Sequence, residues 1–235
     1  MKPEKFNNLG KAILHWLSFQ KLCGREMLFS EYYLSQPIGE FLLHHHSGTL
    51  ASEVLHPNFK KTKDSSENLK GRPRQIDFCL HSRDSGYMKV ALELKWVGEF
   101  PTNKQKVVDD IFRLELLREE KGHVHRYFLV AGETENFTNN FQNVKSNHQS
   151  TRIPFINGFL SFNVGEEVRV VTSELHEPQK AAVLAFGTAY NKSIPARFST
   201  KCIYGESEGG FSVYIWNVIS SGKRKEHDLN QYSIS

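Results

Sequence analysis

The chain has 235 residues, of which 39% are hydrophobic, 24% are charged and 12% are aromatic. This length allows one sizeable core and argues against more than two domains, and the apolar fraction excludes an intrinsically disordered chain. Thirty Lys and Arg residues against 26 Asp and Glu give a formal net charge of +4, which allows a polyanionic partner without indicating one.

Targeting and membrane signals are not evident in the sequence. The longest purely apolar run, 181–186, is far below the roughly 20 residues of a membrane-spanning helix. The first ten residues, MKPEKFNNLG, contain no apolar signal segment. Three scattered cysteines (Cys23, Cys79 and Cys202) form neither a disulfide framework nor a zinc-type pair. We therefore expect a cytoplasmic protein with no membrane partner.

The N-terminal half of the chain predicts two helices and a strand-rich core, from the spacing of its apolar residues. A helix is expected over 9–22, and Ser30 is a suitable N-cap for a second helix that runs to about residue 45. Strands are expected over 49–56, 75–81 and 87–97, the last two joined by a turn at 82–86; a helix follows over 104–121 and a strand over 127–131. The order from 30 to 131 is thus helix, three strands, helix, strand.

The remaining third predicts strands over 159–163, 167–172 and 211–218 and a short helix over 180–189. With no internal repeat and no clear linker, we expect a single domain, 1–235. It consists of a core at about 30–131, the N-terminal helix 9–22 and a β-rich C-terminal extension at about 150–220. The fold class predicted is α/β, with a mixed sheet.

Three charged residues interrupt the apolar strands of the hairpin. If the turn is symmetric about Ser85, Asp77 lies opposite Glu93 on one face of the sheet, and Lys95 follows two residues later on the same face. Opposed carboxylates repel each other, and a divalent cation between them reverses that effect. The plain alternative is a solvated sheet face with a cross-strand salt bridge.

A third carboxylate is expected on the helix that begins near residue 31. Glu31 lies on the apolar stripe of that helix, whereas Glu40 lies on the opposite side. Glu31 is therefore the better candidate, although a carboxylate in the first turn also suits the helix dipole. Glu53, on the first strand, is a second candidate whose face the sequence leaves undecided.

The segments Arg72-Pro73-Arg74-Gln75-Ile76-Asp77-Phe78 and Ala91-Leu92-Glu93-Leu94-Lys95-Trp96 resemble the core motif of the PD-(D/E)xK nuclease superfamily. The chain departs from the usual motif at Ile76, where many members have proline. The resemblance implies a restriction-endonuclease-like core and Mg²⁺- or Mn²⁺-dependent hydrolysis of phosphodiester bonds, DNA before RNA, by an activated water. It further implies that Asp77, Glu93 and the carbonyl of Leu94 bind the metal, that Lys95 is the motif lysine and that Glu31 is an additional glutamate of the site.

Basic residues precede Asp77 in the chain. Six of them stand against two acidic residues in 58–74, namely Lys60, Lys61, Lys63, Lys70, Arg72 and Arg74. This loop either follows a phosphate backbone or is simply solvated. Lys104, Gln105 and Arg113 are expected on an exposed helical face.

The function predicted is a metal-dependent endonuclease, and the pattern also allows a homodimer. The alternative is a catalytically inactive nucleic-acid-binding or assembly module on the same fold.

Overall fold

The computed structural model describes residues 3–57, 75–117, 123–143, 154–190, 194–220 and 226–227. The five α-helices found there are α1 (Pro3–Leu22), α2 (Glu31–His45), α3 (Lys104–Leu116), α4 (Thr134–Phe137) and α5 (Glu177–Tyr190). The strands are β1 (Thr49–Leu55), β2 (Gln75–His81), β3 (Met88–Val97), β4 (His125–Glu133), β5 (Glu167–Val171), β6 (Ile194–Pro195), β7 (Arg197–Glu208), β8 (Phe211–Ser220) and β9 (Glu226–His227). No helix in these ranges is both long and apolar enough to cross a membrane.

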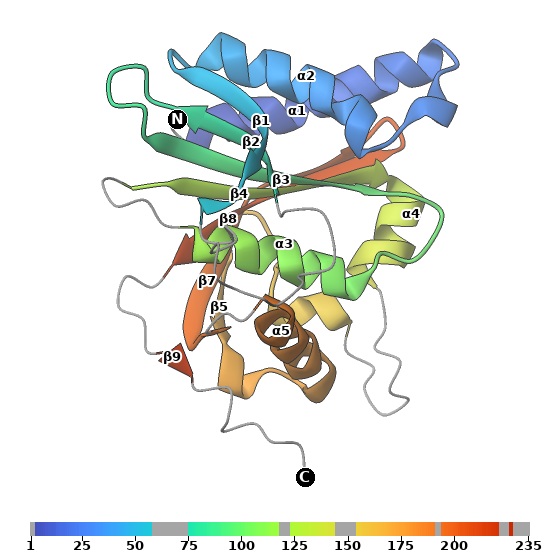
Figure 1. The fold of residues 1–235 in the computed structure, drawn as a ribbon. Coiled ribbons are helices and arrows are strands. Elements are labelled where there is room, and N and C mark those ends of the chain that lie inside the picture. The colour runs from blue at the N-terminus through green and yellow to red at the C-terminus, as the bar shows by residue number, and fades with distance from the viewer. Residues whose placement is uncertain are drawn as a thin grey trace.

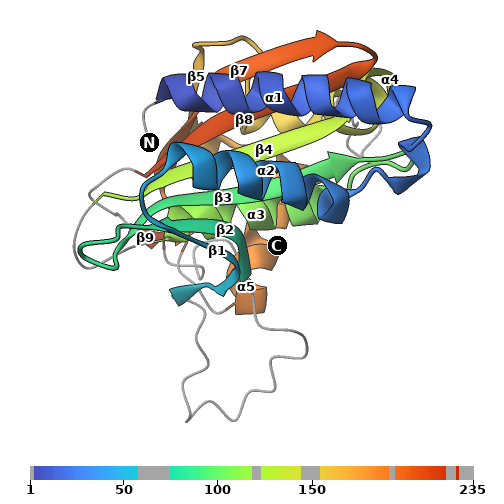
Figure 2. The same ribbon diagram turned by 90° about the horizontal axis from the view of Figure 1, so that it is seen from above.

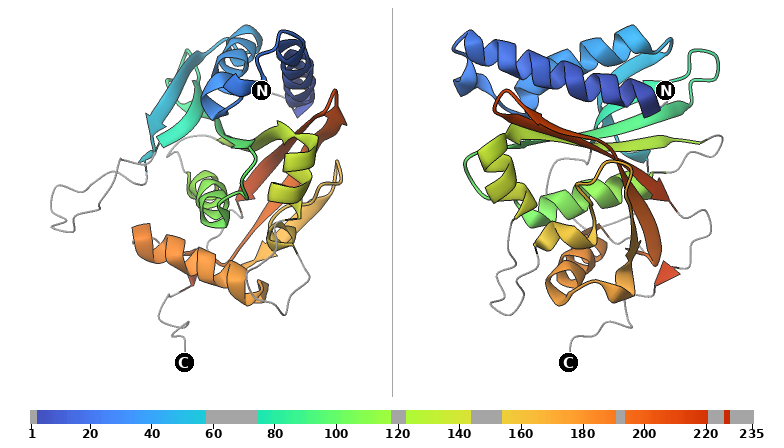
Figure 3. Two further views of the ribbon diagram at one scale, coloured as in Figure 1. Left: turned by 90° about the vertical axis from the view of Figure 1, so that its right-hand side faces the viewer. Right: turned by 180° about the vertical axis from the view of Figure 1, so that it is seen from behind.

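A seven-stranded mixed sheet forms the centre of the molecule, in the order β1-β2-β3-β4-β8-β7-β5 (Figure 1). Helices α1 and α2 lie side by side over one face, with α1 over β7 and β8 (Figure 2). Helix α3 lies against the other face and α5 packs outside α3 (Figure 3). Each face therefore has its own apolar core, and α3 is buried between the sheet and α5.

The predicted order of elements between residues 30 and 131 is confirmed. Strands β1, β2 and β3 pair antiparallel, and β4 pairs parallel with β3 after the crossover through α3. The register inferred for the hairpin is confirmed from Leu80 to Phe78, which lies opposite Leu92. Next to the turn the pairing shifts by one residue, so that His81 lies opposite Met88. The Ser30 hydroxyl accepts a hydrogen bond from the Tyr33 N–H at 3.1 Å, as expected of an N-cap.

Three helices differ from the predicted bounds, and the smallest difference is at α5, which begins at Glu177 rather than at residue 180. Helix α1 begins at Pro3 rather than at residue 9, and its apolar side includes the buried Phe6. Helix α3 ends at Leu116 rather than at residue 121, because the backbone of Leu117 is extended, with ψ of 116°.

The C-terminal third extends the same sheet instead of forming a separate layer. Strand β8 pairs antiparallel with β4, and β7 and β5 follow it outward. The strand predicted at 159–163 is wrong: Phe159 and Leu160 follow a 3₁₀ turn and are buried without joining the sheet. Strand β7 was not predicted, although its buried residues alternate along the chain from Phe198 to Tyr204.

Candidate active site

Regular pairing between β2 and β3 ends at Leu92, before β3 itself ends. Farther along β3, the Leu94 N–H donates to Oδ2 of Asp77 at 2.7 Å. The next N–H that points the same way, that of Trp96, donates to Oε1 of Glu31 at 3.4 Å. Carboxylates therefore replace the strand partner for both groups. We call this region, residues 75–77 of β2 and 93–96 of β3, the strand fork.

The two opposed carboxyl groups predicted from the hairpin meet at the strand fork. Asp77 and Glu93 lie near enough that each carboxyl group affects the pKa of the other. The N–H and C=O of one strand residue point toward the same neighbouring strand, so the Leu94 carbonyl is directed to the Asp77 side of β3. Two carboxylates and one carbonyl oxygen thus face the same place.

Helix α3 supplies an arginine to this cluster. Arg113 donates from Nε and Nη2 to the two oxygens of Glu93, each at 3.0 Å. Its Nη2 also donates to Oδ1 of Asp110, one turn earlier on the helix, at 2.6 Å. The Glu93 side chain is 1% exposed and that of Arg113 is 11% exposed. The expectation that Arg113 lies on an exposed face is therefore wrong, because α3 is covered by α5 on its outer side.

Lys95 connects the two faces of the sheet at the fork. Its Nζ lies 2.8 Å from Oδ2 of Asp110 on α3 and 3.3 Å from Oε1 of Glu31 on α2. These helices cover opposite faces of the sheet, so both reach Lys95 only because β2 no longer pairs with β3 there. Glu31 reaches Lys95, but the prediction that it points inward holds only in part, because its side chain is 51% exposed. Glu40 faces solvent as predicted and accepts a hydrogen bond from Gln36.

Burial makes the opposed carboxylates costly to ionise. It raises the pKa of Asp77 above the ordinary value of 3.8, although the hydrogen bond from Leu94 opposes the shift. Burial also raises the pKa of Glu93 well above its ordinary value, and the Arg113 guanidinium offsets this only in part.

The two basic side chains of the fork stay charged. Burial alone would lower the pKa of Lys95, but the carboxylates of Asp110 and Glu31 outweigh it and raise that pKa. Four carboxylates and two cations, Glu31, Asp77, Glu93 and Asp110 with Lys95 and Arg113, therefore carry a formal charge of −2 when all are ionised.

The donor set at the fork fits a single hard divalent cation. A carboxylate oxygen has two acceptor positions, so Glu93 can bond Arg113 and still offer a lone pair to a metal. Mg²⁺ in proteins is commonly held by one or two carboxylates and keeps several waters, which matches Asp77, Glu93 and the Leu94 carbonyl. No group of three or more His, Cys, Asp or Glu side chains suited to a metal is found in the described ranges. Side chains alone therefore offer only two ligands here.

Glu53, the second candidate, lies on β1 beside the fork. The register of β1 places it opposite Asp77, between the pairs formed by Ser52 and Val54. Its φ of 51° lies in the left-handed region, which is unfavourable for a residue with a side chain. Regular strand alternation is therefore interrupted at this residue. The Glu53 side chain is exposed.

The basic residues proposed to contact nucleic acid, Lys60 to Arg74, lie outside the described residues. Of the remaining candidates, Lys104 and Gln105 are half-buried, and Gln105 donates to Asp109 and to the Ala182 carbonyl.

Asp110 and Arg113 were missed as site residues. Asp110 follows Val107 by three positions and precedes Leu114 by four, so it lies on the apolar stripe of α3. A charge on such a stripe is the signal that could have revealed it. Arg113 carries no comparable signal, since its role depends on how α3 crosses β3.

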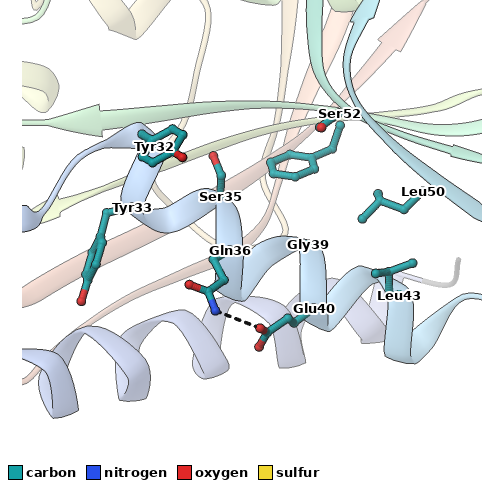
Figure 4. Close-up of a pocket in the computed structure, with 10 residues that line it drawn as sticks. Tyr32, Tyr33, Ser35, Gln36, Gly39, Glu40, Leu43, Leu50 and Ser52 are labelled. Atoms are coloured by element: carbon teal, nitrogen blue, oxygen red, sulfur yellow. Dashed lines mark hydrogen bonds between the residues drawn. The ribbon is translucent and has the colours of Figure 1, made fainter.

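A separate groove of about 480 Å³ lies between α2 and strands β1 and β2 (Figure 4). It is lined by Tyr33, Gln36, Leu50 and Phe78, among others. Phe78 belongs to the core on the α2 face, whereas Glu93 of the fork bonds to α3. The groove is therefore not the place where the candidate residues meet.

Comparisons with protein-family models, with curated proteins and with solved structures found no match to this chain. The functional argument consequently depends on the chemistry of the strand fork.

Proposed function

We propose that the protein is a metal-dependent nuclease that hydrolyses phosphodiester bonds, with DNA as the first substrate to test. The observation that carries the proposal is the strand fork, where Asp77 and Glu93 oppose each other and Lys95 lies two residues beyond. Buried carboxylates with raised pKa values reduce the stability of the fold, and such groups cluster at functional sites. The helix, three-strand, helix, strand order supports a restriction-endonuclease-like core of the PD-(D/E)xK type.

Each residue of the fork has a role in this proposal. Asp77, Glu93 and the Leu94 carbonyl hold a Mg²⁺ or Mn²⁺ ion. When bound, such an ion acts as a Lewis acid and lowers the pKa of water. The Lys95 ammonium, kept protonated by its two carboxylate partners, stabilises negative charge that develops on the phosphate. Glu31 and Asp110 hold the Lys95 side chain in position.

The direct test is cleavage of plasmid, linear duplex, single-stranded DNA and RNA, each with Mg²⁺, with Mn²⁺ or with EDTA. We expect metal-dependent cleavage that Asp77→Asn and Lys95→Met abolish while the far-ultraviolet circular dichroism spectrum is unchanged. Glu31→Gln is expected to reduce the rate about 10²-fold, within the range of a charged group that positions a catalytic one. Glu40→Gln, the same change on the solvent side of α2, is the matched control and should cleave like the wild type. Undiminished cleavage by Asp77→Asn and Lys95→Met would overturn the assignment.

The second candidate function is a nucleic-acid-binding or assembly module without catalysis. The observation in its favour is that Arg113 bonds both oxygens of Glu93, so ion pairs already neutralise part of the fork. Calorimetry with Mn²⁺, with and without DNA, separates the two functions. Absence of metal binding in both conditions would favour the module.

A further inference from the structure

We propose that Arg113 takes the place of a second metal ion, so that the strand fork binds one divalent cation per chain. This inference depends on the proposed function, because it concerns how the same carboxylates share positive charge. The guanidinium lies where a second cation would otherwise be needed, between Glu93 and Asp110.

Arg113 is held firmly enough to act as a permanent cation. It makes three hydrogen bonds to carboxylate oxygens, at 3.0, 3.0 and 2.6 Å. Its own backbone carbonyl is bonded to the buried His56 ring at 2.8 Å, which ties α3 to the end of β1. The planar guanidinium can bond both oxygens of one carboxylate at once, with a geometry that a lysine ammonium does not have.

Each carboxylate oxygen of Asp110 lies next to a cationic side chain. One of its oxygens lies 2.6 Å from Arg113 and the other 2.8 Å from Lys95. Two-metal sites require carboxylates that bridge or surround two ions about 3.5–4 Å apart. Side-chain cations therefore already neutralise Asp110, and the Arg113 guanidinium, not a metal ion, bridges Asp110 to Glu93.

The charge of the cluster also indicates one divalent cation per chain. With all six side chains ionised, one divalent ion cancels the formal charge of −2 at the fork, whereas a second ion would leave an excess of +2 there. Without Arg113 the cluster carries −3, and the oxygens of Glu93 and Asp110 that the guanidinium occupied become available to metal.

The test counts Mn²⁺ ions on the full chain by titration calorimetry and by electron paramagnetic resonance of unbound Mn²⁺. The wild type should bind one ion, and Arg113→Gln should bind two. Arg113→Met, which fills the same buried space with an apolar side chain, is the second variant should Arg113→Gln fail to fold. The control is Arg126→Gln, because Arg126 is also buried but its guanidinium bonds to the Leu117 carbonyl; it should still bind one ion.

Two ions on the wild type, or one ion with unchanged affinity on the folded Arg113 variants, would overturn the inference and leave the proposed function standing. No uptake by the wild type, with or without DNA, would overturn the inference. Cleavage assays run on the same samples test the proposed function separately, and absence of cleavage there would overturn that proposal as well.

Discussion

Removal of the Arg113 guanidinium is expected to destabilise the fold strongly, because it leaves a buried carboxylate without its partner. Glu93 is 1% exposed and loses two hydrogen bonds of 3.0 Å, while Asp110 loses one. Breaking a buried ion pair from one side typically costs about 3–5 kcal/mol. We expect Arg113→Met to lower the free energy of unfolding by that amount at neutral pH.

Removing the charge of Glu93 as well should recover most of the lost free energy of unfolding. In the double variant Arg113→Met/Glu93→Gln, the charge removed from Arg113 is matched by the charge removed from Glu93, so the total cost should be about 1–2 kcal/mol. Glu93→Gln alone should cost a similar amount, since Arg113 keeps its bond to Asp110. The resulting coupling free energy between the two positions is about 3–5 kcal/mol, at or above the upper end for residues in contact.

Urea unfolding in EDTA, followed by the fluorescence of the buried Trp216, measures all four proteins of the cycle. The exposed pair of Lys180 and Glu177, 3.2 Å apart, is the matched control, and Lys180→Met should change stability by less than about 0.5 kcal/mol. Single-variant costs that add to the double-variant cost within about 0.5 kcal/mol would refute the reasoning, because the pair would then contribute nothing beyond its separate side chains.

Three further predictions concern other parts of the structure. Burial raises the pKa of Asp77 in the folded protein, so ionising this carboxyl group costs stability as pH rises above the ordinary value of 3.8, and the cost is complete above the raised pKa. Metal-free Asp77→Asn should therefore gain stability relative to the wild type as pH rises from 3.5 to 7. A difference in urea midpoint that stays constant over this range would contradict the prediction. A side chain at Gly10 would overlap the Tyr204 ring where α1 crosses β7, so Gly10→Val should lower the melting temperature through overpacking of about 1–3 kcal/mol; an unchanged melting temperature would show that α1 docks elsewhere. Of the three free thiols only Cys23 is exposed, and burial raises the pKa of Cys202 to about 12, so a thiol reagent should label one cysteine in the native protein and three in urea; rapid native labelling of two would count against the packing of β7 or β2.

The central residues of the site could be predicted from the sequence because they depend on short-range geometry. A symmetric turn gives the register that the hairpin has beyond the bulge at Leu80 and His81, and strand alternation then decides which side chains share a face. Those two steps are sufficient to bring Asp77 opposite Glu93 and to put Lys95 on the same side. Helical periodicity within a single helix likewise put Glu31 on the side of α2 from which it reaches Lys95, although its side chain is half-exposed there.

The partners on α3 could not be predicted, because they depend on how two elements pack together. Periodicity gave α3 one apolar stripe and a polar remainder, and a polar remainder is ordinarily solvated. The structure instead covers α3 on both sides, so the buried Arg113 must find its charge partner on β3. Strand β7 was missed for a related reason, since the buried positions of its alternation include Thr200 and Cys202, which are weak signals of an apolar face.

The arrangement of the fork argues that its charges are retained for chemistry rather than for stability. Buried ion pairs contribute little net free energy, and apolar residues of the same volume are often better. Here four carboxylates meet only two cations, and burial opposes ionisation of both Asp77 and Glu93. A purely structural network would be expected to balance its charges or to exclude them. An imbalance of two negative charges, at the point where β2 and β3 stop pairing and helices from both faces reach the same lysine, is what a site that recruits one divalent cation requires.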